Sequence, residues 1–311
     1  MKYLFFFFWL FTALLVAQTP YLKQVEHLIH QHQFDQALEL LKAHQTDPEA
    51  LYYQSVIHLV RGNINRAIEL AEKGLAKAQD KDRFYEWLGD IYSVKAQTAN
   101  IFSAMLTAAN IKKNWQKAIE FNPDNLKAKE KLFMFYLMAP QMAGGDQEQA
   151  LKLAKEVAQK DTLRGRLLMA RYYQKQKDVK RAEETYLSAF NQAPDSIHVL
   201  RELASFYMKQ KQFEKARKYV RKILELKPQQ AESYDFFGDF YLQQDKLDSA
   251  LTQYEKAIEI DPFLYRIQFK KAKVLARLGR KNEARAIAQK LLNEEVFFTM
   301  KRQLKKFIDE L

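Results

Sequence analysis

The chain has 311 residues, carries 50 Lys and Arg against 38 Asp and Glu, and contains no cysteine. The missing cysteines exclude a disulfide framework, a thiolate nucleophile and a lipid attached to an N-terminal cysteine. They do not exclude export, because a fold with a large buried area is stable without disulfides.

Residues 1–17 differ from the rest of the chain. A positive start at Lys2 leads into an apolar run from Tyr3 to Ala17, and polar residues begin at Gln18. As a helix this run spans only ~22 Å, short of the ~30 Å hydrocarbon core. We therefore expect a cleavable signal peptide over 1–17 and an exported protein, periplasmic or secreted. Because Leu15 is large for its place before the cleavage site, an uncleaved membrane anchor stays open as the alternative.

Residues 18–162 hold small and aromatic residues at helical spacing in four loosely similar segments. These segments are 18–47, 48–81, 82–125 and 126–162. In the third, Ala118 and Pro123 stand ten residues beyond positions 108 and 113, where the pattern of the later copies would place them. The fourth reaches Ala150 late, after a loop at 139–146.

The two insertions are adjacent, and the inserted residues 99–109 are apolar. We expect the 139–146 loop to cover Ile101, Phe102, Met105 and Leu106, with an exposed contact patch as the alternative. Within that loop, Gly145→Ala is expected to matter less than Gly238→Leu or Ala250→Leu in a later copy, unless Gly145 needs a positive φ.

From Leu163 the pattern becomes regular. Equivalent residues follow at Ile197, Ala231 and Tyr265, in steps of 34 residues. The four clear copies are 163–196, 197–230, 231–264 and 265–293. The copy from Ala231 shows the full pattern, which comprises Tyr234, Phe237, Gly238, Tyr241, Ala250, Tyr254, Ala257 and Pro262.

This pattern resembles the tetratricopeptide repeat, in which two helices cross where short side chains let the backbones approach and proline closes the second helix. The resemblance implies an all-α fold, a right-handed α-solenoid of helical hairpins over 18–293. Residues 294–311 have apolar residues at helical spacing, and we expect a C-terminal capping helix that covers the open face of the last hairpin.

The resemblance also implies that the first helix of each hairpin lines a concave groove that binds a protein or peptide. The groove positions that we expect to contact a partner are basic, acidic and apolar. They are Arg164, Arg171, Lys175, Arg201, Lys209, Lys273 and Arg277, with Asp235 and Asp239, and Met208 and Phe269. The basic excess predicts a partner segment of acidic or mixed charge. A solvated Lys-rich surface is the alternative interpretation.

No residue pattern for catalysis is present, so we expect a scaffold or adaptor of the cell envelope, not an enzyme, with no cofactor. Gly144-Gly145 lacks the following Gly-Lys-Ser/Thr of a phosphate loop. His27 and His30 share a helix face, and accessory metal binding is kept as a weak alternative to a polar helix end. Nucleic acid is not an expected partner, because the repeat type binds proteins and Asp235 and Asp239 interrupt the basic positions. Stable membrane insertion is not expected once the signal is removed.

Overall fold

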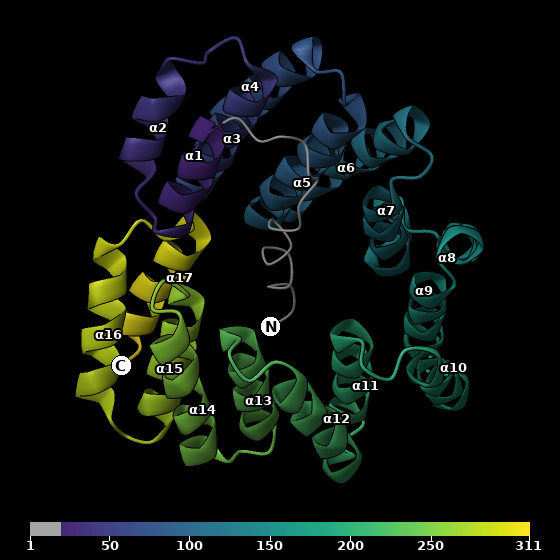
Figure 1. Ribbon diagram of the computed structural model, residues 1–311, viewed down its shortest axis with the longest axis vertical. Helices are drawn as coiled ribbons and strands as arrows, with labels where there is room; N and C mark the ends of the chain where they lie inside the picture. Colours follow the sequence, from purple (N-terminus) through teal and green to yellow (C-terminus); the bar gives the residue numbers. More distant parts are fainter. Residues whose placement is uncertain (1–19) are drawn as a thin grey trace.

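The computed structural model describes residues 20–311, so the expected signal peptide lies outside the described residues. Between Pro20 and Leu311 the chain forms seventeen α-helices, one short 3-10 helix and no strand. The helices follow one another as antiparallel hairpins (Figure 1). The expected all-α solenoid of helical hairpins is confirmed.

Each hairpin has a first and a second helix. The first helices are α1 (Pro20–His30), α3 (Pro48–Val60), α5 (Lys81–Thr98), α7 (Leu126–Met138), α9 (Thr162–Lys175), α11 (Ile197–Lys209), α13 (Ala231–Gln243) and α15 (Tyr265–Arg277). The second helices are α2 (Phe34–Lys42), α4 (Ile64–Lys77), α6 (Ile101–Phe121), α8 (Gln147–Lys160), α10 (Val179–Gln192), α12 (Phe213–Leu226), α14 (Leu247–Ile260) and α16 (Lys281–Asn293). The 3-10 helix η1 (Gln141–Ala143) lies between α7 and α8, and α17 (Phe298–Asp309) ends the chain.

A buried alanine marks the helix crossing in seven of the eight hairpins. It is always the fourth residue of the second helix, and in each case its side chain is fully buried. These residues are Ala37, Ala67, Ala150, Ala182, Ala216, Ala250 and Ala284. A larger side chain there would force the two helices apart, because protein interiors have no spare volume.

Most turns between the paired helices share one backbone conformation. Six of them contain a residue with positive φ, namely His32, Gly62, Lys177, Lys211, Asp245 and Gly279, and Gly144 has a positive φ at the end of η1. The next N–H donates to a carbonyl five residues earlier, as in Gln212 to Tyr207 at 2.9 Å and Lys246 to Tyr241 at 3.0 Å. This is the Schellman arrangement, which satisfies the last carbonyls of the first helix.

The third hairpin is longer than its neighbours but keeps their crossing. Helix α5 has 18 residues and α6 has 21, compared with 13 in α3 and 14 in α4. Gly89 lies against the ring of Trp115, as Gly238 lies against the ring of Tyr254 in the seventh hairpin. The extra residues therefore extend the free end of the hairpin, away from the crossing.

The expectation that the 139–146 loop covers this free end is wrong. Ile101, Phe102 and Leu106 are 72%, 77% and 79% exposed, and Met142 on η1 is 86% exposed. The loop instead packs further back along α6, where Lys112 lies near Gly144. Seven additional residues in α6 carry its first turns beyond the reach of the short loop.

Gly145 has no positive φ, but a close approach of the backbone restricts this position. A Cβ at Gly145 would lie 1.9 Å from the carbonyl oxygen of Ala139. The loop backbone is held against that carbonyl by a hydrogen bond from Gly145 N–H to Pro140 O at 3.0 Å. The constraint is a close backbone approach, which turn composition alone does not reveal.

The solenoid curves until its two ends meet, so that the helices form a ring (Figure 1). Arg61 donates to Glu295 at 2.6 and 2.8 Å and to Asp35 at 2.8 Å. The ring of His32 stacks on Tyr265 with centroids 4.5 Å apart, and its Nδ1 lies 3.0 Å from the carbonyl oxygen of Glu295.

Helix α17 contributes to both sides of this closure. Leu304 is fully buried against the last hairpin, and Phe307 packs edge-on against Phe269 with ring centroids 5.4 Å apart. At its start, Phe298 packs against the turn at Gly62 in the second hairpin. The C-terminal segment thus caps the last hairpin and also joins it to the beginning of the solenoid.

Candidate partner-binding groove

The first helices face the inside of the ring and the second helices face outward (Figure 1). Every groove residue predicted from the sequence belongs to α9, α11, α13 or α15. The helices that carry the groove positions therefore line one continuous inner surface. Most of the charged side chains at these positions already pair with other groups of the chain.

Charged side chains on this surface pair across successive first helices, in a series that we name the ion-pair ladder. Its pairs are Arg83–Glu49 at 2.6 Å, Lys131–Glu86 and Lys131–Asp90 at 2.6 Å, Arg164–Glu130 at 3.5 Å, Arg171–Glu202 at 2.7 Å, Arg266–Asp235 at 2.7 Å, and Lys270–Asp235 and Lys270–Asp239 at 2.7 Å. The ladder neutralises Arg164 and Arg171, which we expected to attract a partner.

The acidic band in the groove is likewise satisfied within the chain. Asp235 is buried and accepts from both Arg266 and Lys270, and Asp239 accepts from Lys270 and from the hydroxyl of Tyr254 at 2.7 Å. Burial alone raises the pKa of Asp235, but the charges of Lys270 and Arg266 outweigh that effect and lower it. These carboxylates are structural groups of the groove wall.

The expected role of two apolar residues as partner anchors is wrong, because both side chains are buried. Met208 is 3% exposed and Phe269 is 4% exposed, and both pack in the hydrophobic core. Neither side chain can contact a partner in this conformation. The cause is superhelical packing, because the neighbouring hairpin and α17 cover positions that would face the groove in an isolated repeat.

Three other basic residues that were predicted to line the groove have different surroundings. Arg201 lies over the ring of Phe236 at 4.9 Å and donates to the carbonyl of Glu232 at 3.3 Å. Lys175 and Lys209 are exposed near the ends of their helices. The predicted basic residues thus do not form one continuous strip of free positive charge.

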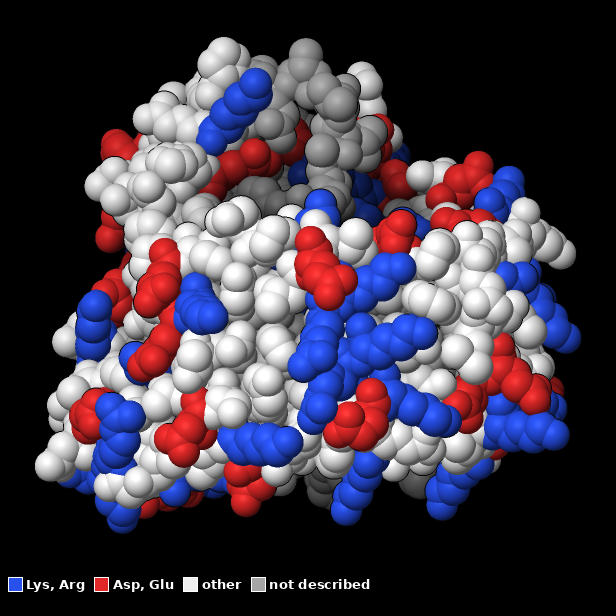
Figure 2. Space-filling model, turned by 60° about the horizontal axis from the view of Figure 1, so that its bottom comes forward, with Lys and Arg blue, Asp and Glu red and all other residues white. Residues whose placement is uncertain are grey.

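Part of the positive excess lies on the outer face. Helix α12 carries five basic residues, Lys215, Arg217, Lys218, Arg221 and Lys222, against two acidic ones. Figure 2 turns the edge of the ring that holds α12 and α14 toward the viewer and shows Lys and Arg crowded in one part of it. Long-range attraction of acidic partners is therefore not confined to the groove.

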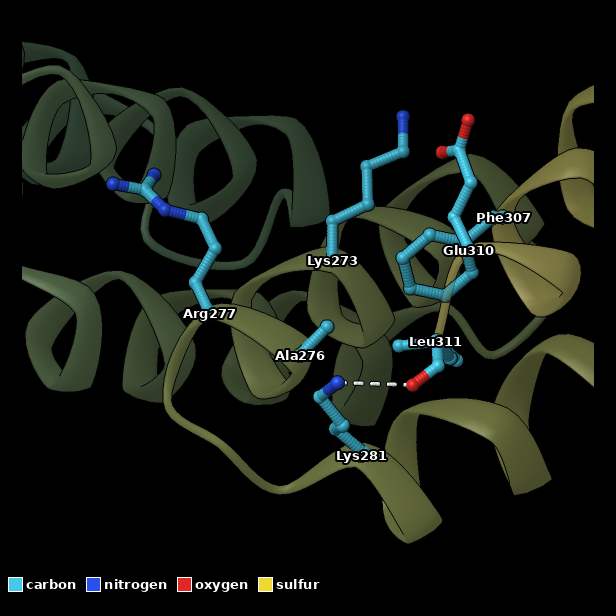
Figure 3. Close-up of a pocket in the computed structure, with 7 residues that line it drawn as sticks. All are labelled: Lys273, Ala276, Arg277, Lys281, Phe307, Glu310 and Leu311. Carbon is cyan, nitrogen blue, oxygen red and sulfur yellow. Dashed lines mark hydrogen bonds between the residues drawn. The ribbon is translucent and has the colours of Figure 1, made fainter.

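One pocket does lie at predicted groove positions, where α17 closes the groove. It has a volume of about 380 Å³ and is lined by Lys273, Ala276, Arg277, Lys281, Phe307, Glu310 and Leu311. In Figure 3, Lys273 and Glu310 extend in the same direction at the mouth, and Phe307 and Leu311 come from the C-terminal segment. We name it the C-terminal pocket.

The charge balance of the C-terminal pocket is positive. Arg277 pairs with Asp245, and Lys281 donates to the main-chain oxygen of Leu311 at 3.0 Å. Lys273 lies 4.0 Å from the centre of the Phe269 ring and has no ion pair with any described carboxylate. Burial lowers the pKa of Lys273, and the charge of Lys270 lowers it further. A carboxylate entering here would gain an ion pair and relieve that repulsion.

The histidine cluster is engaged in closing the ring. His30 lies 3.5 Å from a carboxylate oxygen of Asp261, and His32 contacts Tyr265 and Glu295. No three His, Asp or Glu side chains between residues 20 and 311 gather closely enough to hold a metal ion. Within the same range, no helix is both long enough and apolar enough to cross a bilayer.

Sequence reasoning missed Glu130, Glu202 and Lys270 as partners of the groove charges. A signal was present, because opposite charges on neighbouring first helices are 31 to 35 residues apart in the pairs Arg171–Glu202 and Lys270–Asp235. It also missed Lys281, Phe307 and Glu310, which reach the groove from outside the first helices and have no place in the repeat pattern.

Comparison with known proteins agrees with this architecture. Two family profiles described as tetratricopeptide repeat match residues 195–262 and residues 22–92 and 237–295, together more than half of the chain. No curated protein matches the chain.

Among solved structures, a tetratricopeptide repeat protein from Parabacteroides merdae superposes with a TM-score of 0.54 at 14% identity, covering 82% of this chain and 97% of that one. A thermophilic tetratricopeptide repeat protein from Thermus thermophilus gives 0.46 at 19% identity over 63% of this chain and 99% of its own, which is too distant to carry an argument. The structural likeness shows the fold alone. The profile matches, with the repeated hairpins and the buried alanine of their crossings, show that the chain belongs to the tetratricopeptide repeat family.

Proposed function

We propose that this chain is a non-enzymatic scaffold that binds a segment of another protein at the C-terminal end of its groove. Tetratricopeptide repeats generally bind protein partners, and the ring of hairpins supplies a preformed inner surface that loses little entropy on binding. The observation that carries the proposal is the C-terminal pocket, where Lys273, which has no ion pair among the described residues, adjoins Ala276 and Phe307.

The chemistry of the pocket selects the partner group. The ion-pair ladder neutralises Arg164 and Arg171, and Lys175 and Lys209 are exposed near helix ends. An acidic side chain therefore gains most next to Lys273, which lies over the Phe269 ring in the pocket. Phe307 and Ala276 offer apolar contact beside it. The proposed ligand is therefore a peptide segment that presents an acidic residue next to an apolar one.

The absence of cysteine allows a direct test by site-specific crosslinking. An Ala276→Cys variant labelled with a photo-crosslinker should capture a partner from the native cell extract, and Lys273→Met should abolish most of that capture. Methionine keeps the apolar stem over Phe269 and removes only the charge. The control is Lys218→Met on α12, which also lies over an aromatic ring, Tyr219, on the outer face.

Equal losses from Lys273→Met and Lys218→Met would show that net charge acts diffusely and would contradict the pocket. Capture that is unchanged by Lys273→Met would place the binding site elsewhere. Circular dichroism of both variants checks that the helices are intact.

The proposed place of action is the cell envelope. Its support is the composition of residues 1–17, with Lys2 followed by an apolar run. Mass spectrometry of the protein from its native cells should find Gln18, or a residue within two of it, as the N-terminus. A membrane-bound form with Met1 to Ala17 intact would favour the tethered alternative.

A further inference from the structure

The lengthened hairpin ends in a cluster of exposed apolar side chains that the protein interaction groove does not use. We name Ile101, Phe102 and Leu106 on α6 the apolar tip. Among the other large apolar side chains of the described residues, only Met142 on η1 is exposed to this degree, at 86%; Phe121 follows at 52%, and Leu226 and Ile260 are 38% exposed. A contiguous set of such exposed side chains marks a contact surface.

The tip projects beyond the adjoining hairpin. Helix α6 has seven more residues than α4, an extension of ~10 Å at 1.5 Å per residue. Helix η1 of the next hairpin packs further back along α6, near Lys112, so it does not enclose the tip. The apolar tip is therefore convex, and a rigid protein partner would need a matching hollow to bury it.

The chain segments that carry the tip and η1 have charge of one sign. Residues 91–119 contain no Asp or Glu and four Lys, at positions 95, 112, 113 and 117. Residues 131–145, which contain η1, also contain no Asp or Glu. The first acidic residues beyond η1 are Asp146, whose carboxylate caps α8, and Glu148.

The apolar and basic residues lie in one stripe of α6. Phe102, Leu106, Ala109 and Lys113 are all exposed and follow the i, i+4, i+7, i+11 spacing of a single helix face. Side chains on a helix lean toward its N-terminus, so Lys113 extends toward the tip. This arrangement resembles an interfacial helix, whose apolar end enters the acyl region while Lys side chains reach the headgroups.

We propose that the apolar tip docks onto an anionic phospholipid bilayer. Lys113 and Lys95 complement negative headgroups, and a fluid bilayer accepts a convex apolar projection without a preformed pocket. A second copy of this chain is disfavoured as the occupant, because tip-to-tip contact would bring two basic surfaces together. The docking is peripheral and independent of the C-terminal pocket.

The test uses the full chain with one introduced cysteine. Ser103→Cys, labelled with an environment-sensitive fluorophore, should show a blue shift with vesicles of phosphatidylglycerol and phosphatidylcholine, and little shift with phosphatidylcholine alone. Ser188→Cys, exposed on α10, should show none. In co-flotation of the unlabelled chain, Phe102→Ser with Leu106→Ser should weaken binding by at least about tenfold, and Lys113→Glu by about fivefold or more.

The matched control is Leu226→Ser with Ile260→Ser, which removes two exposed apolar side chains away from the tip and should leave vesicle binding unchanged. Flotation without a fluorophore shift at position 103 would show that another segment binds lipid and would overturn the proposal. A shift that needs no vesicles and grows with protein concentration would identify a second copy as the occupant and would also overturn it.

Discussion

The guanidinium of Arg171 on α9 makes two hydrogen bonds to the carboxylate of Glu202 on α11, at 2.9 and 2.7 Å. The pair joins consecutive first helices, as the other steps of the ion-pair ladder do. A bidentate pair restricts both distance and orientation, so the ladder helps to fix the angle between neighbouring hairpins and hence the curvature of the ring.

Removing one member of this pair should destabilise the fold. We expect Glu202→Gln to lower the free energy of unfolding by about 1 to 3 kcal/mol, because Arg171 is then left partly buried without a countercharge. Arg171→Glu should also destabilise the fold, because it would place two carboxylates side by side. Urea unfolding of both variants measures the change. Arg171→Glu that unfolds at the same urea concentration as the parent would refute the pairing.

The same pair predicts a pH dependence. Burial alone raises the pKa of Glu202, but the charge of Arg171 and its hydrogen bonds outweigh this and lower the pKa to about 2. A carboxylate whose pKa is lowered in the folded state adds stability above its ordinary pKa of 4.5, and that stability is lost as the pH falls toward 2. Glu202→Gln should flatten the stability curve over this interval, as urea unfolding between pH 6 and pH 2.5 would show.

The control for that pH prediction is Glu69→Gln. The hydrogen bonds from Lys73 and Arg66 also lower the pKa of Glu69 to about 2, but this group is exposed on α4. Solvent screens exposed pairs, so Glu69→Gln should change the curve much less. If both variants flatten the dependence of stability on pH equally, the Arg171–Glu202 pair stabilises the fold no more than an exposed ion pair does.

The turns offer a stabilising substitution. Lys211 lies between α11 and α12 with φ of 58°, a left-handed conformation that costs a residue with a Cβ about 1 to 2 kcal/mol. Glycine removes this strain but loses more entropy on folding. We therefore expect Lys211→Gly to raise the free energy of unfolding by about 0.5 to 1 kcal/mol in thermal or urea unfolding.

A helix-interior glycine provides the comparison. Lys218→Gly, in the middle of α12, should lower the stability by about 1 kcal/mol. Destabilisation by Lys211→Gly as well would show that the side chain contributes more than the backbone strain.

The repeat period predicted the hairpins because each crossing depends on a local pattern of small and large residues. Residues equivalent to Gly238, Tyr254 and Ala250 recur at fixed offsets, because the two helices of each hairpin cross in the same way. The covered state of Met208 and Phe269 could not be predicted in this way. It depends on how a small rotation per repeat accumulates until distant hairpins and α17 meet.

The inserted loop predicts how two glycine substitutions rank in their effect on stability. Gly145→Ala should cost about 1 to 3 kcal/mol, because its Cβ would meet the carbonyl oxygen of Ala139 and backbone moves less easily than a side chain. Gly279→Ala, where no atom lies within 4 Å of the added Cβ, should cost only the strain of its positive φ, about 1 kcal/mol. Thermal unfolding that ranks Gly279→Ala as the more damaging change would contradict this assignment.

Closure of the ring brings together residues that are far apart in the sequence, since Arg61 and Glu295 are 234 residues apart in the chain. Phe298→Ala with Glu295→Ala should remove both the packing on Gly62 and the ion pair, and allow the ends to separate. Dyes at Gln36→Cys and Arg302→Cys should then show lower energy transfer than in the parent, with each hairpin still helical by circular dichroism. Leu226→Ala, on the outer face far from the closure, should leave the transfer unchanged. If the transfer also stays high in the double alanine variant, the curvature is set by the ion-pair ladder and the hairpin packing alone, and the contacts between the ends only follow from it.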